Sequence, residues 1–184
     1  MDYYRIKGQK ELSGTVEISG SKNSALPILA ATLLTDEPCI LHNVPQLKDI
    51  ATMIKLLELL GKKIVREKST LRITSDRELN FIAPYEIVKT MRASICVLGP
   101  LIAMLNKARV SLPGGCAIGP RPVDLHIKGL QALGATISIE HGYIIAESEK
   151  LIGADIYLAG LYGPSVLATG NVMMAANYAS GITK

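Results

Sequence analysis

A cysteine and an arginine lie on one loop that is rich in glycine and proline. Cys116 follows Gly114 and Gly115, and Arg121 stands between two prolines shortly afterwards. Glycine lets the backbone turn sharply and approach a ligand, and proline fixes the path of the chain. A thiol on such a loop can react, and a nearby cation favours its thiolate form. The pattern therefore predicts a reactive thiol at Cys116, with a turn carrying an incidental cysteine as the alternative.

Cations recur immediately before segments with helical patterning. Lys22 and Asn23 lie between a glycine and the first apolar segment, and Arg92 occupies the corresponding place before the second. Arg121 and Asp124 precede a third helix-like run. Free N–H groups at a helix start attract anions, and an adjacent cation strengthens the attraction. We expect these groups to share an anionic ligand; a solvated Lys22 beside a capping Asn or Ser is the alternative.

Elements that would position these residues recur with a period of roughly 70 residues. Each unit is predicted to contain a strand, a helix, a second strand, a second helix and a hairpin. The endings of the second helices, Leu59-Leu60-Gly61 and Ala132-Leu133-Gly134, resemble each other. Expected helices are 24–34, 47–60, 94–102, 124–133 and 165–176, with Pro27 in the first turn of its helix, and expected strands are 14–20, 39–43, 63–67, 70–75, 108–112, 136–140 and 143–146.

The polarity of these elements indicates how they are layered. The first helix of each unit is apolar nearly all round, which is typical of a helix enclosed by other elements. The hairpins alternate apolar and polar residues, as sheets with one wet face do. The sequence thus predicts an inverted, inside-out α/β barrel domain of repeated βαβαββ units, with helices inside and sheets outside. The third unit stops at Lys184, and we expect it to be incomplete.

Composition narrows the classes of function. The chain has 184 residues, 48% hydrophobic and 20% charged, a net charge of +4 and no Trp. Such a chain folds as a globular domain, and its few aromatic residues argue against stacking on nucleic acid. No apolar run is long enough to span a bilayer, and the N-terminus lacks an apolar signal core. We expect a cytoplasmic protein that binds anionic small molecules rather than nucleic acid or membranes.

Cysteine usage points to a reducing compartment. The three cysteines, Cys39, Cys96 and Cys116, form no CxxC pair. A disulfide framework and a zinc site are therefore not expected. Cys39 falls in a strand and Cys96 in an apolar helix, so both are interpreted as small core residues.

Four motifs together give the chain a specific resemblance. It resembles the UDP-N-acetylglucosamine enolpyruvyl transferases over essentially its whole length. The motifs are Ser19–Pro27, Lys89–Ser94, Leu112–Gly119 and Arg121–His126. The resemblance implies transfer of the enolpyruvyl group of phosphoenolpyruvate to the 3-hydroxyl of UDP-N-acetylglucosamine with release of phosphate, an early step of peptidoglycan synthesis. It implies no metal and no cofactor.

The same resemblance implies roles for individual residues. Cys116 would be the proton donor, able to bond to phosphoenolpyruvate and to the antibiotic fosfomycin. Lys22 and Asn23 would hold phosphoenolpyruvate, and Arg92 and Arg121 would neutralise phosphate or carboxylate charge. The UDP-sugar site would be lined by Arg121, Pro122, Val123, Asp124, Leu125, Ser165 and Val166.

The resemblance also implies two domains closing over the substrates. Residues 1–21 would belong to the second domain, and residues 22–184 would form the first, incomplete at its C-terminus. An aspartate base and further arginines would come from the second domain, so we expect the isolated chain to turn over little substrate. Leu167 stands where the family usually has glycine. Alternatives are an enzyme like 5-enolpyruvylshikimate-3-phosphate synthase and a non-catalytic UDP-sugar-binding remnant.

Overall fold

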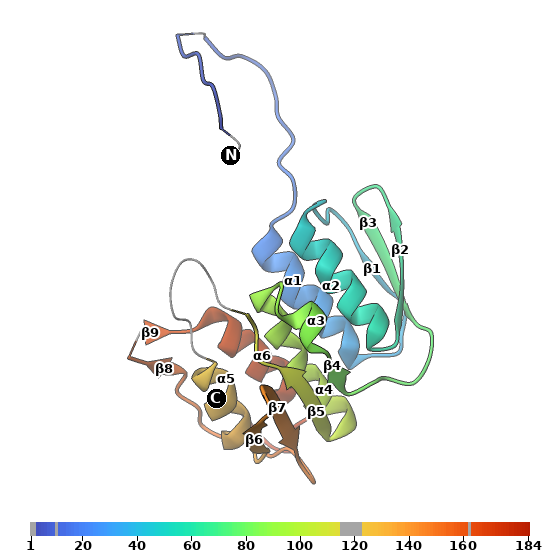
Figure 1. The fold of residues 1–184 in the computed structure, drawn as a ribbon, viewed down its shortest axis with the longest axis vertical. Coiled ribbons are helices and arrows are strands. Elements are labelled where there is room, and N and C mark those ends of the chain that lie inside the picture. Colours follow the sequence, from blue (N-terminus) through green and yellow to red (C-terminus); the bar gives the residue numbers. More distant parts are fainter. Residues whose placement is uncertain (1–2, 10, 115–122, 162) are drawn as a thin grey trace.

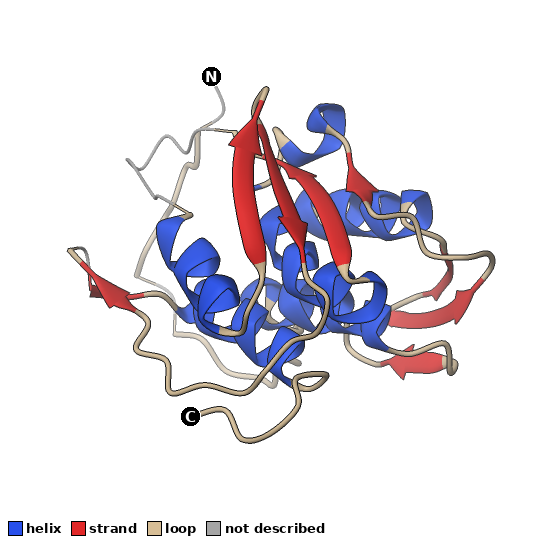
Figure 2. Ribbon diagram, turned by 90° about the horizontal axis from the view of Figure 1, so that it is seen from below, coloured by secondary structure: helices blue, strands red, loops and turns tan. Residues whose placement is uncertain are grey.

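Helices occupy the centre of the fold and strands lie at its periphery (Figures 1 and 2). This computed structural model describes residues 3–9, 11–114, 123–161 and 163–184. Residues 3–20 extend away from the body of the molecule, which begins at the first helix (Figure 1).

The first repeat unit forms a three-stranded sheet packed against two helices. Its elements are α1 (Lys22–Ala31), the 3₁₀ helix η1 (Thr32–Leu34), β1 (Cys39–Leu41), α2 (Lys48–Leu59), β2 (Lys62–Glu67) and β3 (Thr70–Ser75). The strands are antiparallel in the order β1-β3-β2, with Ile73 opposite both Cys39 and Ile64. α2 packs on α1 and on β2.

The second unit repeats this arrangement with one additional strand. Its elements are β4 (Ile82–Ala83), α3 (Tyr85–Val88), the 3₁₀ helix η2 (Arg92–Val97), α4 (Leu98–Leu105), β5 (Lys107–Ser111), α5 (Asp124–Ala132), β6 (Thr136–Glu140) and β7 (Tyr143–Glu147). The sheet order is β4-β5-β7-β6, so β5-β7-β6 reproduces β1-β3-β2. Gly61 and Gly134 follow the ends of α2 and α5 with φ of 113° and 96°, a conformation that favours glycine. The predicted repeat is thereby confirmed.

The third unit contributes a short hairpin and the last helix. These are β8 (Ala159–Gly160), β9 (Gly163–Pro164) and α6 (Val166–Ala176). α6 packs on α4 and α5, with further contacts to η2 and α1. Three successive apolar helices, α1, η2–α4 and α6, therefore meet at the centre.

The layering of helices and sheets determines which side chains form the hydrophobic core. Leu29 and Leu101 are fully buried on the central helices and Leu57 on α2, while Ile144 and Ala146 are buried on one face of β7. The predicted arrangement of helices inside and sheets outside is confirmed. The described strands form three separate sheets and do not close a barrel.

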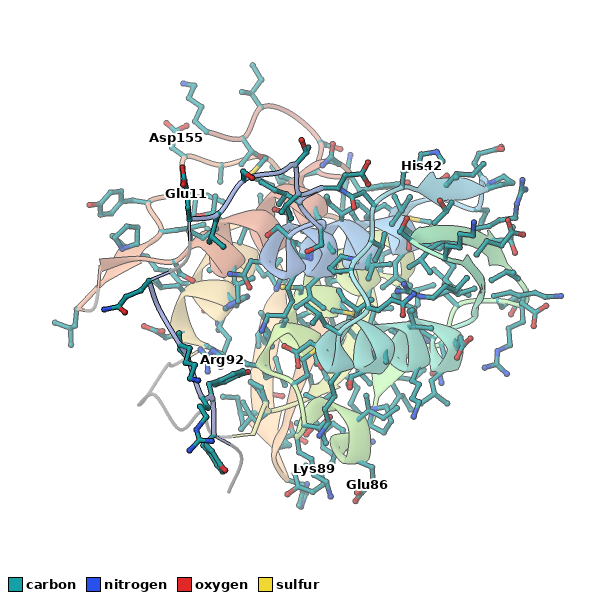
Figure 3. All side chains as sticks on the ribbon, turned by 90° about the horizontal axis from the view of Figure 1, so that it is seen from above. Glu11, His42, Glu86, Lys89, Arg92 and Asp155 are labelled. Atoms are coloured by element: carbon teal, nitrogen blue, oxygen red, sulfur yellow. The ribbon has the colours of Figure 1, made fainter. Side chains whose placement is uncertain are left out.

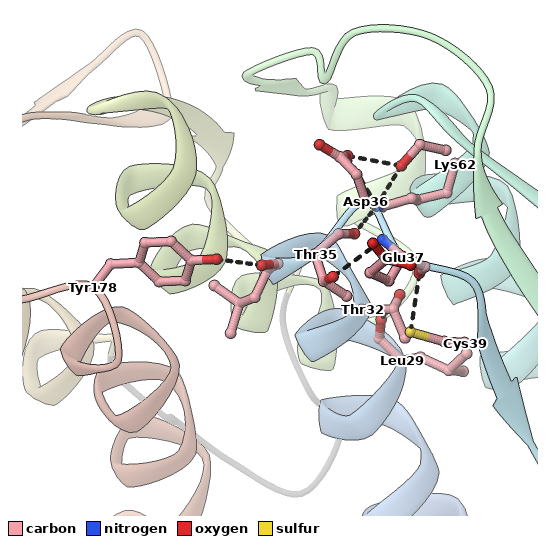
Figure 4. A network of polar contacts seen from close by, with 10 residues as sticks. Leu29, Thr32, Thr35, Asp36, Glu37, Cys39, Lys62 and Tyr178 are labelled. Carbon is pink, nitrogen blue, oxygen red and sulfur yellow. Dashed lines mark hydrogen bonds and ion pairs between the residues drawn. The ribbon is translucent and has the colours of Figure 1, made fainter.

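A buried lysine anchors the turn between η1 and β1 (Figure 4). Lys62 Nζ donates to the carbonyl of Thr35 at 2.6 Å and to Ser75 Oγ at 3.0 Å. Burial lowers the pKa of Lys62, and the carboxylate of Asp36, 3.9 Å away, opposes that shift. Nearby, the Tyr178 hydroxyl donates to the carbonyl of Leu34, which connects the chain after α6 to the end of η1.

Two sequence-based expectations near the N-terminus are wrong. Residues 14–20 form no strand, and Val16 and Ile18 are 86% exposed. A strand needs a second strand to pair with, and among the described residues this segment has none. Helix α1 begins at Lys22 instead of Ser24, because Ser21 accepts a hydrogen bond from the Ser24 amide as N-cap. Pro27 consequently lies inside the helix and not in its first turn.

The expected helix 94–102 is also divided in two. Its first half is the 3₁₀ helix η2, whose last turn closes when the Leu98 amide donates to the Ile95 carbonyl. An α-helix follows from Leu98. Pro100 has no N–H, so the first turn of α4 tolerates it. The division places Gly99 against α6.

Replacing Gly99 tests this close packing. A Cβ at Gly99 would lie 2.1 Å from the Asn171 carbonyl oxygen, whereas a Cβ at Gly170 would meet no atom within 4 Å. We expect Gly99→Ala to lower the free energy of unfolding by about 1–3 kcal/mol. Gly170→Ala, in the interior of α6, should raise it by up to about 1 kcal/mol. Urea unfolding of both variants measures the difference; equal stability would contradict the described α4–α6 contact.

Candidate functional site

The first candidate cation is held at the start of α1. Lys22 is the first residue of α1, and its Nζ contacts Asp49 Oδ2, in the first turn of α2, at 2.8 Å. Asn23 follows it and is exposed. The Gly20 amide donates to Asn43 Oδ1 at 3.1 Å, and a Cβ at Gly20 would lie 1.8 Å from the Asn43 carbonyl oxygen. This close approach fixes the direction in which the chain enters α1.

The second candidate cation occupies the equivalent place. Arg92 is the first residue of η2 and partly buried, and η2 packs against α1. Figure 3 shows it apart from Lys89 and Glu86, which pair with each other. A hydrogen bond to Glu86 raises the pKa of Lys89. The expected equivalence of Lys22 and Arg92 as helix-starting cations is confirmed.

The first turn of α5 lies beside the β8–β9 hairpin. Val123 is the N-cap position, and Asp124 and Leu125 begin the helix. A Cβ at Gly160 would lie 3.6 Å from Leu125 Cδ2 and 3.7 Å from Asp124 Oδ2. The hairpin leads directly into Ser165, the N-cap of α6, whose Oγ accepts the Ala168 amide at 3.2 Å. Val166 is 87% exposed, so this surface is open to solvent.

A buried histidine connects α5 with Arg92. His126 is 2% exposed, and its Nδ1 lies 3.0 Å from Asn171 Nδ2 on α6. The pKa of His126 is lowered to about 4, chiefly by burial and also by the charge of Arg92, with Asp124 opposing the shift. The imidazole is therefore neutral at pH 7. Arg92 lies close enough to His126, in the first turn of α5, for its charge to affect the imidazole.

The loop with the candidate thiol begins close to these groups. A Cβ at Gly114 would lie 2.2 Å from the Lys89 carbonyl oxygen, and the Leu112 amide donates to the Gly142 carbonyl at 2.8 Å. The stem of the loop thus passes beside the segment that leads to Arg92. Cys116, Arg121 and Pro122 themselves lie outside the described residues.

Sequence and fold comparisons place this chain in a known family. Residues 6–184 match the family model of EPSP synthase (3-phosphoshikimate 1-carboxyvinyltransferase). The chain belongs to the EPSP synthase family. Among solved structures, this family member shares its fold with the enolpyruvyl transferase NikO from Streptomyces tendae, at a TM-score of 0.76 and 18% identity over 94% of this chain and 40% of NikO. EPSP synthase from Acinetobacter baumannii gives a TM-score of 0.66 at 15% identity over 91% of this chain and 39% of that one.

Curated relatives are much more similar in sequence. The chain is 57% identical over 183 residues to the UDP-N-acetylglucosamine 1-carboxyvinyltransferase of Methylacidiphilum infernorum and 53% identical to that of Desulfatibacillum aliphaticivorans. Each alignment covers 100% of this chain and 43% of the relative. The chain therefore spans less than half the length of these relatives.

The other two cysteines of this EPSP synthase family member belong to its interior. Cys96 is fully buried, and burial raises its pKa to about 12, which keeps the thiol protonated. Cys39 is partly buried and packs against the core, with Sγ 3.6 Å from the Glu37 carbonyl oxygen. Their interpretation as packing residues is confirmed.

No group of three or more His, Cys, Asp or Glu side chains in the described part of the chain could hold a metal ion. Within the same ranges, no helix is both long and apolar enough to cross a membrane.

Sequence reasoning missed three residues that contact the candidate site. Asp49 pairs with Lys22, and Asn171 and His126 form the contact beside Arg92. One signal was present: Asn171 is a polar residue within an otherwise apolar helix, and such residues need a partner when buried. The Lys22–Asp49 pair joins two helices and has no comparable signal.

The neutral state of His126 makes stability depend on pH. The unfolded chain takes up a proton near pH 6.5, whereas the folded chain takes it up only near pH 4. Stability is therefore fully present above pH 6.5 and is lost as the pH falls toward 4, by about 3 kcal/mol at most. Urea unfolding at a series of pH values measures the loss, and His126→Gln should remove that part of the pH dependence. An unchanged slope in the variant would contradict a neutral, buried His126.

Proposed function

We propose that this chain forms part of an enolpyruvyl transferase that moves the enolpyruvyl group of phosphoenolpyruvate to the 3-hydroxyl of UDP-N-acetylglucosamine. The observation that carries the proposal is the 57% identity, over the whole chain, to a UDP-N-acetylglucosamine 1-carboxyvinyltransferase. The presence of Lys22 and Arg92 at the starts of α1 and η2 supports it, because both substrates are anions.

Each candidate residue receives a role in this proposal. Lys22 and Asn23 bind phosphoenolpyruvate at the start of α1, and Arg92 and Arg121 neutralise its phosphate or carboxylate. Arg121, Pro122 and the first turn of α5, Val123–Leu125, line the nucleotide-sugar site together with Ser165 and Val166. The exposure of Val166 supports this assignment. Leu167 adjoins this surface and is the residue most able to restrict the nucleotide.

The proposed chemistry needs an acid at the loop and positive charge around phosphate. The Cys116 thiol gives its proton to the C3 methylene of phosphoenolpyruvate while the sugar 3-hydroxyl oxygen bonds to C2 and passes its proton to a base. The C2–O bond to phosphate then breaks as the Cys116 thiolate takes a proton back from C3, which restores the double bond and the thiol. Cations at the helix starts stabilise the phosphate as it departs. The base and further cations come from the remainder of the longer protein, and no metal or cofactor takes part.

The proposal also assigns a cellular setting and a domain division. Residues 22–184 form most of one domain, and residues 1–21 pack in the other. Exposed apolar side chains along the N-terminal segment, including Tyr4, Leu12 and Val16, support this division, since they find no cover in the described chain. The enzyme acts in the cytoplasm, in peptidoglycan and cell-wall synthesis, without binding nucleic acid or membranes.

A shikimate-3-phosphate acceptor is the second candidate, because the matching family model bears the name of EPSP synthase. The solved EPSP synthases are only 15–16% identical to this chain, against 52–57% for the curated UDP-sugar enzymes. The identities therefore favour the UDP-sugar acceptor.

Ligand titration separates these possibilities. We expect the chain to bind UDP-N-acetylglucosamine in calorimetry and not shikimate-3-phosphate. Arg92→Ala should weaken binding of phosphoenolpyruvate by about tenfold or more, because a charge-assisted contact is lost. The matched control is Arg72→Ala, at an exposed arginine on the outer face of the β1–β3–β2 sheet, and it should leave affinity unchanged. Preferential binding of shikimate-3-phosphate would favour the second candidate.

The candidate thiol is tested by alkylation. Fosfomycin should modify Cys116 and spare Cys96, since a buried, protonated thiol is not a nucleophile. Peptide mass spectrometry locates the adduct, and Cys116→Ser should abolish it. Phosphate release by the isolated chain should be negligible, because substrate activation needs groups from both sides of the site. Modification of Cys96 or Cys39 in place of Cys116 would refute the assigned role.

A further inference from the structure

One side-chain amide joins the three helices that begin at the proposed substrate site. Asn171 of α6 is fully buried. Its Oδ1 accepts the Gly99 amide of α4 at 2.7 Å, and its Nδ2 donates to the Ile95 carbonyl of η2 at 3.2 Å and contacts His126 Nδ1 of α5 at 3.0 Å. Both N–H groups and the oxygen are thus engaged, so the amide has one possible orientation.

This orientation determines the state of the histidine. Because Asn171 Nδ2 is a donor, His126 Nδ1 must accept, and the proton of the neutral ring resides on Nε2. The ring lies in the first turn of α5, within the electrostatic reach of Arg92 from η2 and of Asp124 from its own helix. The orientation of the Asn171 amide therefore sets the tautomer of the imidazole on which the charges of Arg92 and Asp124 act.

A purely structural role would be filled better by an apolar residue. The surrounding helices are apolar, with Ile95, Leu98 and Ala175 all buried. Burying an amide among them carries a desolvation penalty that leucine or methionine would avoid. A buried network in which every donor and acceptor is hydrogen-bonded permits only one arrangement of its side chains, whereas apolar packing does not impose a single arrangement.

We propose that Asn171 and His126 are a positioning pair, which holds the starts of η2, α5 and α6 in the mutual geometry that the substrates require. The proposal rests on the proposed function, since it assigns the pair to the site of that reaction. Neither residue needs to touch substrate. The hydrogen bonds of Asn171 set the distance between α6 and η2–α4. The contact of Asn171 with His126 fixes the first turn of α5, which bears Asp124, relative to these helices.

Asn171→Asp tests the pair with little change in volume. A carboxylate cannot donate, so His126 should present N–H at Nδ1, and the tautomer should reverse. Long-range ¹H–¹⁵N correlation of the imidazole detects the reversal, with His42 and His141 as internal references. We expect affinity for UDP-N-acetylglucosamine in calorimetry to fall by about tenfold or more, as is usual when groups that orient ligand-binding residues are changed. Met174→Ala, also buried on α6 but outside the network, should retain both the tautomer and the affinity.

The histidine offers a second comparison that does not depend on the folding of Asn171→Asp. His126→Gln keeps an acceptor for Asn171 and should retain affinity, whereas His126→Leu removes it and should lose affinity. If Asn171→Asp reverses the tautomer yet binds UDP-N-acetylglucosamine as well as wild type, or if His126→Leu binds as well as His126→Gln, the positioning role is overturned while the proposed function stands.

Failure of the proposed function would be recognised separately. If the wild-type chain does not bind UDP-N-acetylglucosamine, the NMR chemical shift of the side-chain Nε–H of Arg92 tests whether Asn171 and His126 position Arg92. A shift of that resonance in Asn171→Asp, without one in Met174→Ala, supports positioning of Arg92. An unchanged resonance overturns it.

Discussion

The constraint on which the centre of this fold depends is the hydrogen-bonding capacity of one buried amide. An amide among apolar helices must find partners for its oxygen and both hydrogens, and Asn171 finds them on two other helical segments. Its contact with Gly99 leaves no room for a side chain there, and it occupies the point where η2 gives way to α4. The close α4–α6 packing and the tautomer of His126 both follow from this requirement, whereas burial is what keeps the imidazole neutral.

The helices-inside arrangement places the candidate cations at equivalent points of the repeat. Each unit sends its first helix into the centre, so the residues that begin those helices lie where the chain passes from the periphery inward. Lys22, Arg92 and Ser165 occupy such positions on α1, η2 and α6. In the proposed function, free N–H groups at these helix starts add to the charge of the cations in attracting an anion.

Local patterns sufficed for much of this architecture. Alternation predicted both hairpins, the Leu-Gly endings predicted where α2 and α5 stop, and charge before apolar segments predicted the equivalence of Lys22 and Arg92. The predictions were wrong where the local structure depends on residues that are distant in the sequence. The segment 14–20 has strand patterning but no paired strand among the described residues. The Gly99 amide, just after η2 gives way to α4, donates to a side chain 72 positions away, Asn171. The carboxylate beside Lys22 depends likewise on tertiary packing.

The two helix-starting cations differ in surroundings, and the difference bears on how an anion would bind. Lys22 already contacts the carboxylate of Asp49 at a solvent-exposed position, so an incoming anion must share or displace that partner in water, where the exchange is inexpensive. Arg92 is partly buried beside an imidazole that burial keeps neutral. Because the dielectric constant is lower around Arg92, the interaction energy between Arg92 and a nearby charge is larger there. In the proposed function, Lys22 is therefore suited to adjustable contact with a ligand and Arg92 to a fixed one, and a fixed contact is what the proposed positioning pair would secure.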